Sequence, residues 1–326
     1  GKAAAGSLAS NEPAIAGSDA VRAAVAATLG DLHRYPDPLA SELRDRLAAE
    51  HGVDADQVLV GNGSDELIFL LVLAYAAMGG SVGLATPPYR MHELVPAMLG
   101  ARVEAVALRQ WRHDLGAMSA SEVDLAFVCN PHNPTGTAVS GTEIAAFARD
   151  CRAGLVVVDE AYVEFADDPG ALSAMPLAAA GELVVMRTFS KLHGLAALRV
   201  GYLVGPAGVV GHLRTLRMPF SVNVAAQAAA AAALADRQTS EAVRCYTAGA
   251  RQRLVRAFAS AGYASVPSQA NFILVLADDE EGLVRQLARS GVSVRPGRLL
   301  GVPGAVRVSV PSPEGMELLE EALRRR

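Results

Sequence analysis

Short runs of apolar and β-branched residues recur through the first two thirds of the chain, separated by stretches with helical periodicity. Runs of this kind, bounded by turn residues, are typical of buried strands. The predicted strands cover residues 58–60, 81–85, 125–129, 155–159, 183–188 and 200–204, with helices such as 41–51, 66–78 and 143–149 between them. Strands that alternate with helices favour a mostly parallel sheet covered by helices on both faces, and such sheets bind ligands where their strands end.

The pattern changes after about residue 241. A long helix over 242–261 is followed by a strand at 271–276, a helix at 280–290, short strands near 292–295 and 306–310, and a terminal helix at 313–325. We therefore predict an α/β protein with a large domain over residues 35–238 and a smaller α+β domain over 239–326. Residues 1–34 are predicted to form an N-terminal segment that packs with the small domain.

Composition narrows the class of protein. Of the 326 residues, 51% are hydrophobic and 19% are charged, which excludes a disordered chain. The longest apolar run, 67–78, is too short for the ~20 residues of a membrane span, and a net charge of −5 is unlike that of a nucleic-acid-binding protein. Three cysteines, Cys129, Cys151 and Cys245, have no metal-ligand spacing and fit a reducing cytoplasm. We expect a cytoplasmic protein without metal, membrane or nucleic-acid partners.

Four strand ends carry residues suited to chemistry, and the first follows the strand at 58–60. The sequence VLVGNGSDE places Gly61 and Gly63 in a turn and Ser64 and Asp65 at the start of the next helix. Glycines let backbone N–H groups approach a ligand closely, and a helix N-terminus favours an anion. The segment indicates a phosphate cradle without the lysine of a P-loop. An ordinary turn, with Ser64 or Asp65 capping the helix, is the alternative.

The second and third strand ends supply an amide and a carboxylate. In FVCNPHNPTG (127–136) two Asn-Pro pairs fix an irregular loop that would hold the amide of Asn133 in place. In LVVVDEAYVEF (155–165) Asp159 ends an apolar strand, where an unpaired carboxylate is costly to bury, and Tyr162 follows three residues later. The alternatives are plain turn chemistry for the first segment and a helix-capping aspartate for the second.

The fourth strand end combines a lysine with an arginine. In VVMRTFSKLHGLAALRVGY (184–202) Lys191 follows a buried strand, close to Thr188 and Ser190, and Arg199 lies between two apolar residues. A lysine held away from bulk water is a candidate nucleophilic amine, although most lysines are solvated surface residues. The guanidinium of Arg199 would need a buried partner.

Together these ends offer an amine, a carboxylate, an amide, a phenol, a guanidinium and an anion cradle. Pyridoxal phosphate needs such a set, because its aldehyde forms a Schiff base with a lysine, its pyridinium nitrogen needs a carboxylate, and its phosphate needs amides and an arginine. The sequence therefore predicts an enzyme that uses pyridoxal 5'-phosphate.

With these motifs the chain resembles the fold-type I, class I/II pyridoxal-phosphate-dependent aminotransferases, in particular the histidinol-phosphate aminotransferase family and its aromatic amino acid aminotransferase relatives. The segments that carry the resemblance span nearly the whole chain: LASNE, RYPDP, GNGSDE, NPTG, DEAY, TFSK, LRVGY, PSQANF and VRVSV. The resemblance implies the fold-type I architecture and a homodimer with shared active sites.

The resemblance also implies a role for each matching residue. Lys191 would bind the cofactor and shuttle the proton, Asp159 would keep the pyridine nitrogen protonated, and Tyr162, with Asn133, would hydrogen-bond the phenolic oxygen. The other cofactor residues would be the ring-stacking Tyr89, the phosphate ligands Gly63, Ser64, Asp65, Thr188, Ser190 and Arg199, and Tyr35, which would reach the partner subunit's phosphate. The substrate would meet Asn11, Arg295 and Arg307, and Arg307 would fork onto its carboxylate or an equivalent anion.

The sequence defines the substrate less well than the chemistry. The segment SNEPAIAG lacks the tyrosine of the NENPYGP-like segment in histidinol-phosphate enzymes, and LASNE, MPFSVN and PSQANF look closer to the aromatic branch. We expect an aminotransferase that moves an amino group from an aromatic amino acid, or from histidinol phosphate, to a 2-oxo acid such as 2-oxoglutarate. The alternatives are histidinol-phosphate aminotransferase proper and a decarboxylase of a phosphorylated amino acid. A non-catalytic ligand-binding module and a nucleotide-binding dehydrogenase fit the motifs less well.

The sequence leaves the roles of two residues open. His193 stands where the family commonly has an aromatic residue. Arg295 either binds a substrate phosphate or second carboxylate, or is a surface arginine after a strand.

Overall fold

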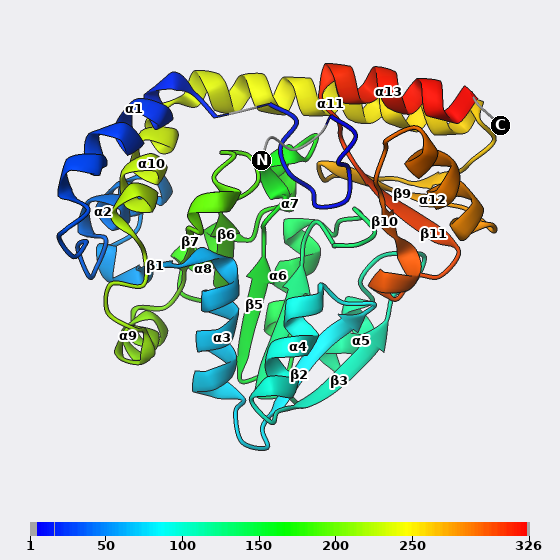
Figure 1. The fold of residues 1–326 in the computed structure, drawn as a ribbon. Coiled ribbons are helices and arrows are strands. Elements are labelled where there is room, and N and C mark those ends of the chain that lie inside the picture. Colours follow the sequence, from blue (N-terminus) through cyan, green and yellow to red (C-terminus); the bar gives the residue numbers. More distant parts are fainter. Residues whose placement is uncertain (1–4, 16, 325–326) are drawn as a thin grey trace.

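The computed structural model describes residues 5–15 and 17–324, and over these residues the chain forms two sheets with helices around them (Figure 1). The strands are β1 (Val58–Gly61), β2 (Ser81–Thr86), β3 (Arg102–Ala107), β4 (Leu125–Cys129), β5 (Leu155–Asp159), β6 (Val184–Thr188), β7 (Gly201–Val204), β8 (Ser265–Val266), β9 (Phe272–Leu276), β10 (Arg295–Pro296) and β11 (Ala305–Ser309). The α-helices are α1 (Asp19–Ala27), α2 (Ser41–His51), α3 (Gly63–Tyr75), α4 (Arg90–Met98), α5 (Leu115–Ser119), α6 (Gly141–Asp150), α7 (Pro169–Leu172), α8 (Met175–Ala179), α9 (Ala207–Leu216), α10 (Val224–Ala235), α11 (Arg237–Ser260), α12 (Glu280–Arg289) and α13 (Pro313–Arg324).

The large sheet has the strand order β1-β7-β6-β5-β4-β2-β3. Neighbours from β6 to β3 are parallel, and β7 is antiparallel to both β1 and β6. The predicted mostly parallel sheet is therefore confirmed. The sequence pattern did not reveal β3, an edge strand that is exposed along most of its length. Its alternation of charged and apolar residues lacks the continuous apolar run of a strand buried on both faces.

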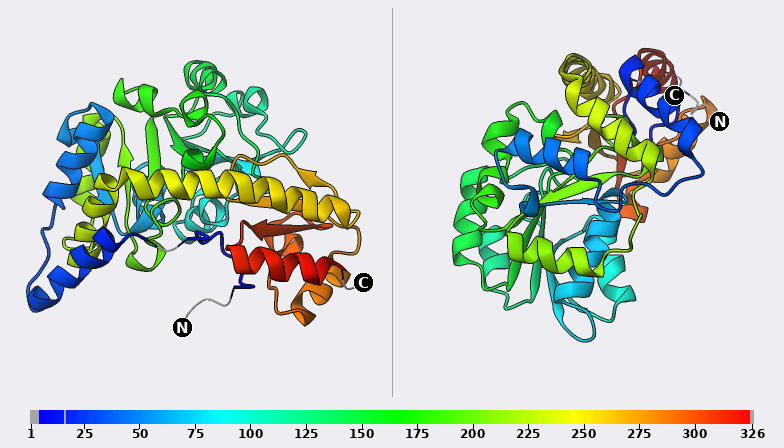
Figure 2. Two further views of the ribbon diagram at one scale, coloured as in Figure 1. Left: turned by 90° about the horizontal axis from the view of Figure 1, so that it is seen from above. Right: turned by 90° about the vertical axis from the view of Figure 1, so that its left-hand side faces the viewer.

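Both faces of the large sheet are buried, which explains the unbroken apolar runs. In β4, Ala126 and Val128 belong to the hydrophobic cluster on one face, and Leu125 and Phe127 belong to the cluster on the other. Successive side chains of a strand point to opposite faces, so each strand needs apolar residues at every position. Helices lie on both faces of the sheet (Figures 1 and 2).

The small sheet is antiparallel, with the order β10-β11-β9-β8. It packs with α11, α12 and α13 around a core of its own. The chain near Leu8 joins this unit, because Leu8 N donates to Ser293 O at 2.8 Å and Ser309 N donates to Leu8 O at 2.9 Å. Helix α1 packs instead on α10 of the large unit. The domain boundaries stay predictions. So does the terminal residue of the last predicted helix, which lies outside the described residues.

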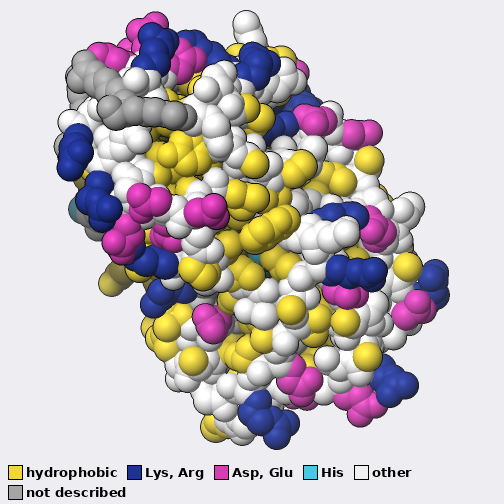
Figure 3. Space-filling model, turned by 90° about the vertical axis from the view of Figure 1, so that its right-hand side faces the viewer, with side chains coloured by type: hydrophobic (Ala, Val, Ile, Leu, Met, Phe, Trp, Pro, Cys, Tyr) yellow, Lys and Arg dark blue, Asp and Glu magenta, His cyan; other side chains and the backbone are white. Residues whose placement is uncertain are grey.

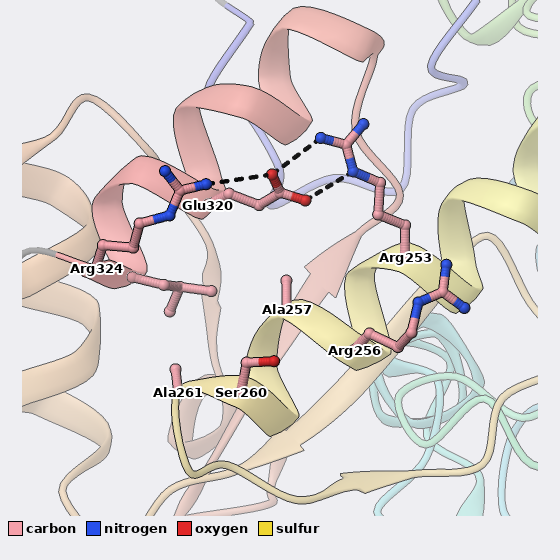
Figure 4. Close-up of a pocket in the computed structure, with 8 residues that line it drawn as sticks. Arg253, Arg256, Ala257, Ser260, Ala261, Glu320 and Arg324 are labelled. Carbon is pink, nitrogen blue, oxygen red and sulfur yellow. Dashed lines mark hydrogen bonds and ion pairs between the residues drawn. The ribbon is translucent and has the colours of Figure 1, made fainter.

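Helix α11 runs along the molecule from the α1 end to the small sheet (Figure 2). Its first half contributes Val243 to a cluster with Phe165 and Leu192, and its second half contributes Leu254 and Phe258 to the small core. Near its C-terminus, Arg253 donates to both carboxylate oxygens of Glu320 in α13, at 2.7 and 2.9 Å (Figure 4). Helix α11 thus joins the two units of the fold.

The face that carries the small sheet and the β3 edge shows apolar side chains among charged ones (Figure 3). Val103 of β3 and Leu299, in the short turn of helix at Gly297–Leu300, are among the exposed apolar residues. Among the described helices, none combines the length and the apolar character that crossing a bilayer requires.

Candidate active site

A cavity of about 310 Å³ lies at the carboxyl ends of β4, β5 and β6, between the large sheet and the small one. Residues from all four strand-end motifs line it, together with residues from LASNE and VRVSV, whereas RYPDP and PSQANF contribute none. They are Ala9, Ser10, Asn11, Ser64, Asp65, Pro88, Tyr89, Arg90, Cys129, Asn133, Asp159, Ala161, Tyr162, Thr188, Ser190, Lys191, Ala196, Arg199, Arg295, Leu299, Leu300 and Arg307.

One end of the cavity lies at the start of α3, where a guanidinium and a carboxylate form an ion pair. Arg199 Nη2 lies 3.1 Å from Asp65 Oδ2, and the other oxygen of Asp65 accepts the Tyr89 hydroxyl at 3.1 Å. Gly63, at φ +75°, makes this approach possible, because a Cβ there would lie 2.6 Å from Arg199 Nη2. The N-terminus of α3, which carries Ser64, therefore lies beside the guanidinium of Arg199. A side chain at position 63 would fill the space between them. Thr188 and Ser190, at the end of β6, line the same cavity.

Asp159 is buried at the end of β5, beside a histidine that sequence reasoning missed. His92 Nε2 lies 3.2 Å from Asp159 Oδ2, and both side chains are 2% exposed. The imidazole stacks on Phe127, with ring centroids 4.4 Å apart. His92 follows Tyr89 by three residues at the start of α4, so both point toward the site, and this spacing was the available signal.

The phenol of Tyr162 is the meeting point of two amides. Asn133 Nδ2 donates to the Tyr162 hydroxyl at 3.3 Å, and Asn11 Nδ2 donates to it at 3.1 Å. The carbonyl of Asn11 in turn accepts Lys191 Nζ at 3.3 Å, and Lys191 Nζ lies 5.5 Å from the Tyr162 ring centroid. The amine, the phenol and both amides therefore lie within one hydrogen-bonded group.

Asn11 is held in an unusual conformation. It is 1% exposed and has φ +55°, in the left-handed region. Its side chain accepts Ser309 Oγ at 3.1 Å, and Asn271 Nδ2 donates to its carbonyl at 3.1 Å. We predicted that Asn11 would bind substrate. Its described contacts are instead to Tyr162, Lys191, Ser309 and Asn271, and its role stays a prediction.

Two arginines from neighbouring strands face the cavity opposite the sheet. Arg307 of β11 is 6% exposed and donates to Asn133 Oδ1 and to Ala9 O, both at 2.7 Å. Its buried Nε has no hydrogen-bond partner among the described residues. Arg295 of β10 is its register partner. Burial lowers the pKa of Arg307, and the charge of Arg295 lowers it further.

Two residues singled out from the sequence lie elsewhere. Tyr35 is 82% exposed and stacks on Phe220 at 4.7 Å between ring centroids, away from the cavity of its own chain. His193 points away from the cavity, with Nε2 3.7 Å from Glu164 Oε1, and burial lowers its pKa.

The residues present fit pyridoxal phosphate. The space above Gly63, the N-terminus of α3 and Arg199 suit a phosphate dianion. Asp159 suits a protonated ring nitrogen, Asn133 and Tyr162 suit the phenolic oxygen, and Lys191 Nζ opens into the same cavity. The unpartnered Nε of Arg307 leaves a donor for a further anion.

Comparisons with known proteins agree with this chemistry. The model of the family described as "Aminotransferase class I and II" matches residues 6–325. A histidinol-phosphate aminotransferase of Symbiobacterium thermophilum is 40% identical over 319 residues, covering 96% of this chain and 88% of that protein. Histidinol-phosphate aminotransferase 2 of Pseudomonas fluorescens is 38% identical, covering 97% of this chain and 87% of that protein.

A solved structure extends the similarity to three dimensions. The histidinol-phosphate aminotransferase of Sinorhizobium meliloti, in complex with pyridoxal-5'-phosphate, superposes with a TM-score of 0.91 at 30% sequence identity. The match covers 98% of this chain and 91% of that one.

Proposed function

Because the chain belongs to the aminotransferase class I and II family and is a pyridoxal-phosphate-dependent transaminase, we propose that its amino donor is histidinol phosphate and its acceptor a 2-oxo acid such as 2-oxoglutarate. The observation that carries the choice of donor is the pairing of Arg295 with Arg307 at one cavity. Two guanidinium groups match a phosphate dianion, which histidinol phosphate carries in place of a carboxylate. An aromatic amino acid, which the sequence motifs favoured, has only one carboxylate for the pair.

The cofactor supplies an electron sink for the carbon that carries the amino group. Nζ of Lys191 would take the proton from that carbon, and the Asn11 carbonyl 3.3 Å away would orient the amine. The Asp159 carboxylate, which lies 3.2 Å from His92 Nε2, would hold a proton on the ring nitrogen. Asn133 and Tyr162 would hydrogen-bond the phenolic oxygen, and Arg307 and Arg295 would bind the substrate's distal anion.

A half-reaction screen tests the donor. The protein with bound cofactor is mixed separately with histidinol phosphate, phenylalanine, tyrosine and phosphothreonine, and loss of its visible absorbance band is followed. We expect histidinol phosphate to remove the band at the lowest concentration. Faster loss with an aromatic amino acid would contradict the choice of donor, and release of carbon dioxide from phosphothreonine would contradict transamination.

The substitution Arg295→Gln should weaken donor binding selectively. A charge-assisted hydrogen bond contributes about 1.5–3 kcal/mol, and exposure of Arg295 reduces this, so we expect KM for histidinol phosphate to rise about tenfold with little change in kcat. Arg298→Gln is the matched control, because its guanidinium pairs with Glu281 at 2.5 Å. Steady-state kinetics decide, and an unchanged KM in Arg295→Gln would remove Arg295 from the substrate site.

The active unit that we propose is a homodimer in which Tyr35 of each chain reaches the phosphate pocket of the other. Tyr35 lies outside its own cavity and stacks on Phe220, and both rings are exposed apolar surface that suits a second copy. Leu29, Leu32 and Met218, close to them in the sequence, are exposed as well. The reducing cytoplasm, which suits the three free cysteines, is the proposed location.

Mixed dimers test this arrangement. A dimer of one Tyr35→Phe chain and one Lys191→Ala chain has one site with both residues intact only if Tyr35 acts across the interface. We expect that site to bind cofactor with wild-type affinity, whereas Tyr35→Phe homodimers bind about tenfold more weakly. Tyr263→Phe, a change in the small core beside Phe258, is the control. Weak cofactor binding in the mixed dimer, or a monomer by size-exclusion chromatography, would contradict the proposal.

A further inference from the structure

Arg251 is a buried arginine of α11 that lies where the helix passes from the large unit to the small one. It is 5% exposed, and its neighbour in the helix, Ala250, belongs to the small core. Burying a guanidinium is costly unless its donors are satisfied. The partners that satisfy Arg251 come from two other segments of the chain.

Arg251 binds one segment from each unit. Its Nη1 donates to the carbonyl of Phe165, at 2.9 Å, and to the carbonyl of Ala270, at 3.1 Å. Its Nη2 lies 2.5 Å from Asp167 Oδ1. Phe165 and Asp167 follow β5 of the large sheet, and Ala270 precedes β9 of the small one.

Gln269 completes the connection between the same two segments. Its Nε2 donates to Asp167 Oδ2 at 3.0 Å, and its Oε1 accepts Asp167 N at 2.8 Å. Its backbone N donates to Gly136 O at 2.7 Å. The loop of Asn133 is thereby tied to the same point, and a Cβ on Gly136 would lie 2.3 Å from Ser268 Oγ. We call Arg251, Asp167 and Gln269 the latch.

Two backbone carbonyls that the latch binds, those of Phe165 and Gly136, each lie three residues along the chain from a hydrogen-bonding group of the phenolic-oxygen site. Phe165 follows Tyr162 by one turn of 3₁₀-helix, and Gly136 follows Asn133 by one tight loop. The next residue after Ala270 is Asn271, whose side chain holds the carbonyl of Asn11 beside Lys191. Loss of the latch would release the backbone on three sides of Tyr162 while leaving every side chain in the cavity.

We propose that Arg251 is a positioning residue, which sets the hydrogen bonds of Tyr162 and Asn133 to the cofactor's phenolic oxygen by fixing the backbone segments that carry both. This inference rests on the proposed cofactor roles of those two residues. It makes the small unit part of the cofactor site through α11, because the same guanidinium fixes the loop before β9.

The test is Arg251→Met, read by absorbance of the bound cofactor against pH. Hydrogen bonds from Tyr162 and Asn133 favour the deprotonated form of the link with Lys191. Their loosening should therefore move the pH midpoint of the visible band upward by about half a unit. Arg251→Lys keeps the positive charge but loses the paired Nη1 and Nη2 donors of the guanidinium. It should give a smaller shift of the midpoint in the same direction. A wild-type midpoint in Arg251→Met would overturn the proposal, even if the variant unfolds at a lower temperature.

Two further variants keep the test decisive. Gln269→Ala removes both side-chain contacts to Asp167 from a half-buried position, so it tests the latch if Arg251→Met fails to fold; it should shift the midpoint the same way. Arg253→Met, two residues along α11 and paired with Glu320 at the surface, should leave the midpoint unchanged (Figure 4). An equal shift in Arg253→Met would assign the effect to the helix in general and overturn the proposal. If Tyr162→Phe leaves the midpoint unchanged, the cofactor roles fail instead of the latch.

Discussion

Replacing Lys191 with alanine should abolish transamination, with a loss of kcat of about 10⁴-fold or more. The substitution removes the only amine of the cavity's lining residues, which we propose attaches the cofactor covalently and acts as the base. The visible band of the bound cofactor should disappear as well. Stopped-flow absorbance with histidinol phosphate measures both effects, and thermal unfolding checks that the variant is folded.

The sequence provides an exact control for this substitution, because the chain contains only two lysines, Lys2 and Lys191. Lys2→Ala makes the same change at the other lysine and should keep the band and the activity. Borohydride reduction of the wild-type protein should fix the cofactor to a single peptide, the one that contains Lys191. Label on the Lys2 peptide, or activity above about one per cent in Lys191→Ala, would contradict the assignment.

Asp159→Asn should have the second largest effect, a fall in kcat of about 10³-fold. Asn has nearly the shape of Asp but no charge, so the ring nitrogen would lose the carboxylate that we propose keeps it protonated. Single-turnover kinetics with a saturating donor isolate the chemical step from donor binding.

Asp114→Asn is the control for that charge change, because Asp114 caps α5 away from the cavity. It should leave the single-turnover rate unchanged. A fall of less than tenfold in Asp159→Asn would mean that the ring nitrogen does not depend on this carboxylate.

The fold was predictable from the sequence where burial on both faces produced continuous apolar runs, as in β4 and β5. The edge strand β3 was not predicted because it faces solvent along most of its length. A sequence pattern indicates burial more reliably than it indicates strand geometry. The position of α1 escaped for a related reason. An amphipathic helix shows which face is buried but not which neighbour covers it, and α1 packs on α10 in place of the small unit.

The cavity was predictable to the extent that parallel strands bring their carboxyl ends together. Asp159 ends a strand and Lys191 and Asn133 each follow one, so topology alone places them at one edge of the sheet. His92 was not found because a histidine within a helix is more often part of the core than of a site. The role proposed for Arg251 could not be predicted from the sequence, because it depends on hydrogen bonds to residues 84 and 19 positions away.

The contact between Asn11 and Ser309 joins positions 298 residues apart, and Arg307 binds Ala9 O over the same separation. During synthesis the ribosome therefore exposes Lys191, Asp159 and the whole large sheet before the strand that receives the N-terminal segment has been made. A nascent chain can fold the sheet early, but Asn11 has no Ser309 to bind until β11 has left the exit tunnel. Completion of the pocket therefore has to wait until β11 has been synthesised.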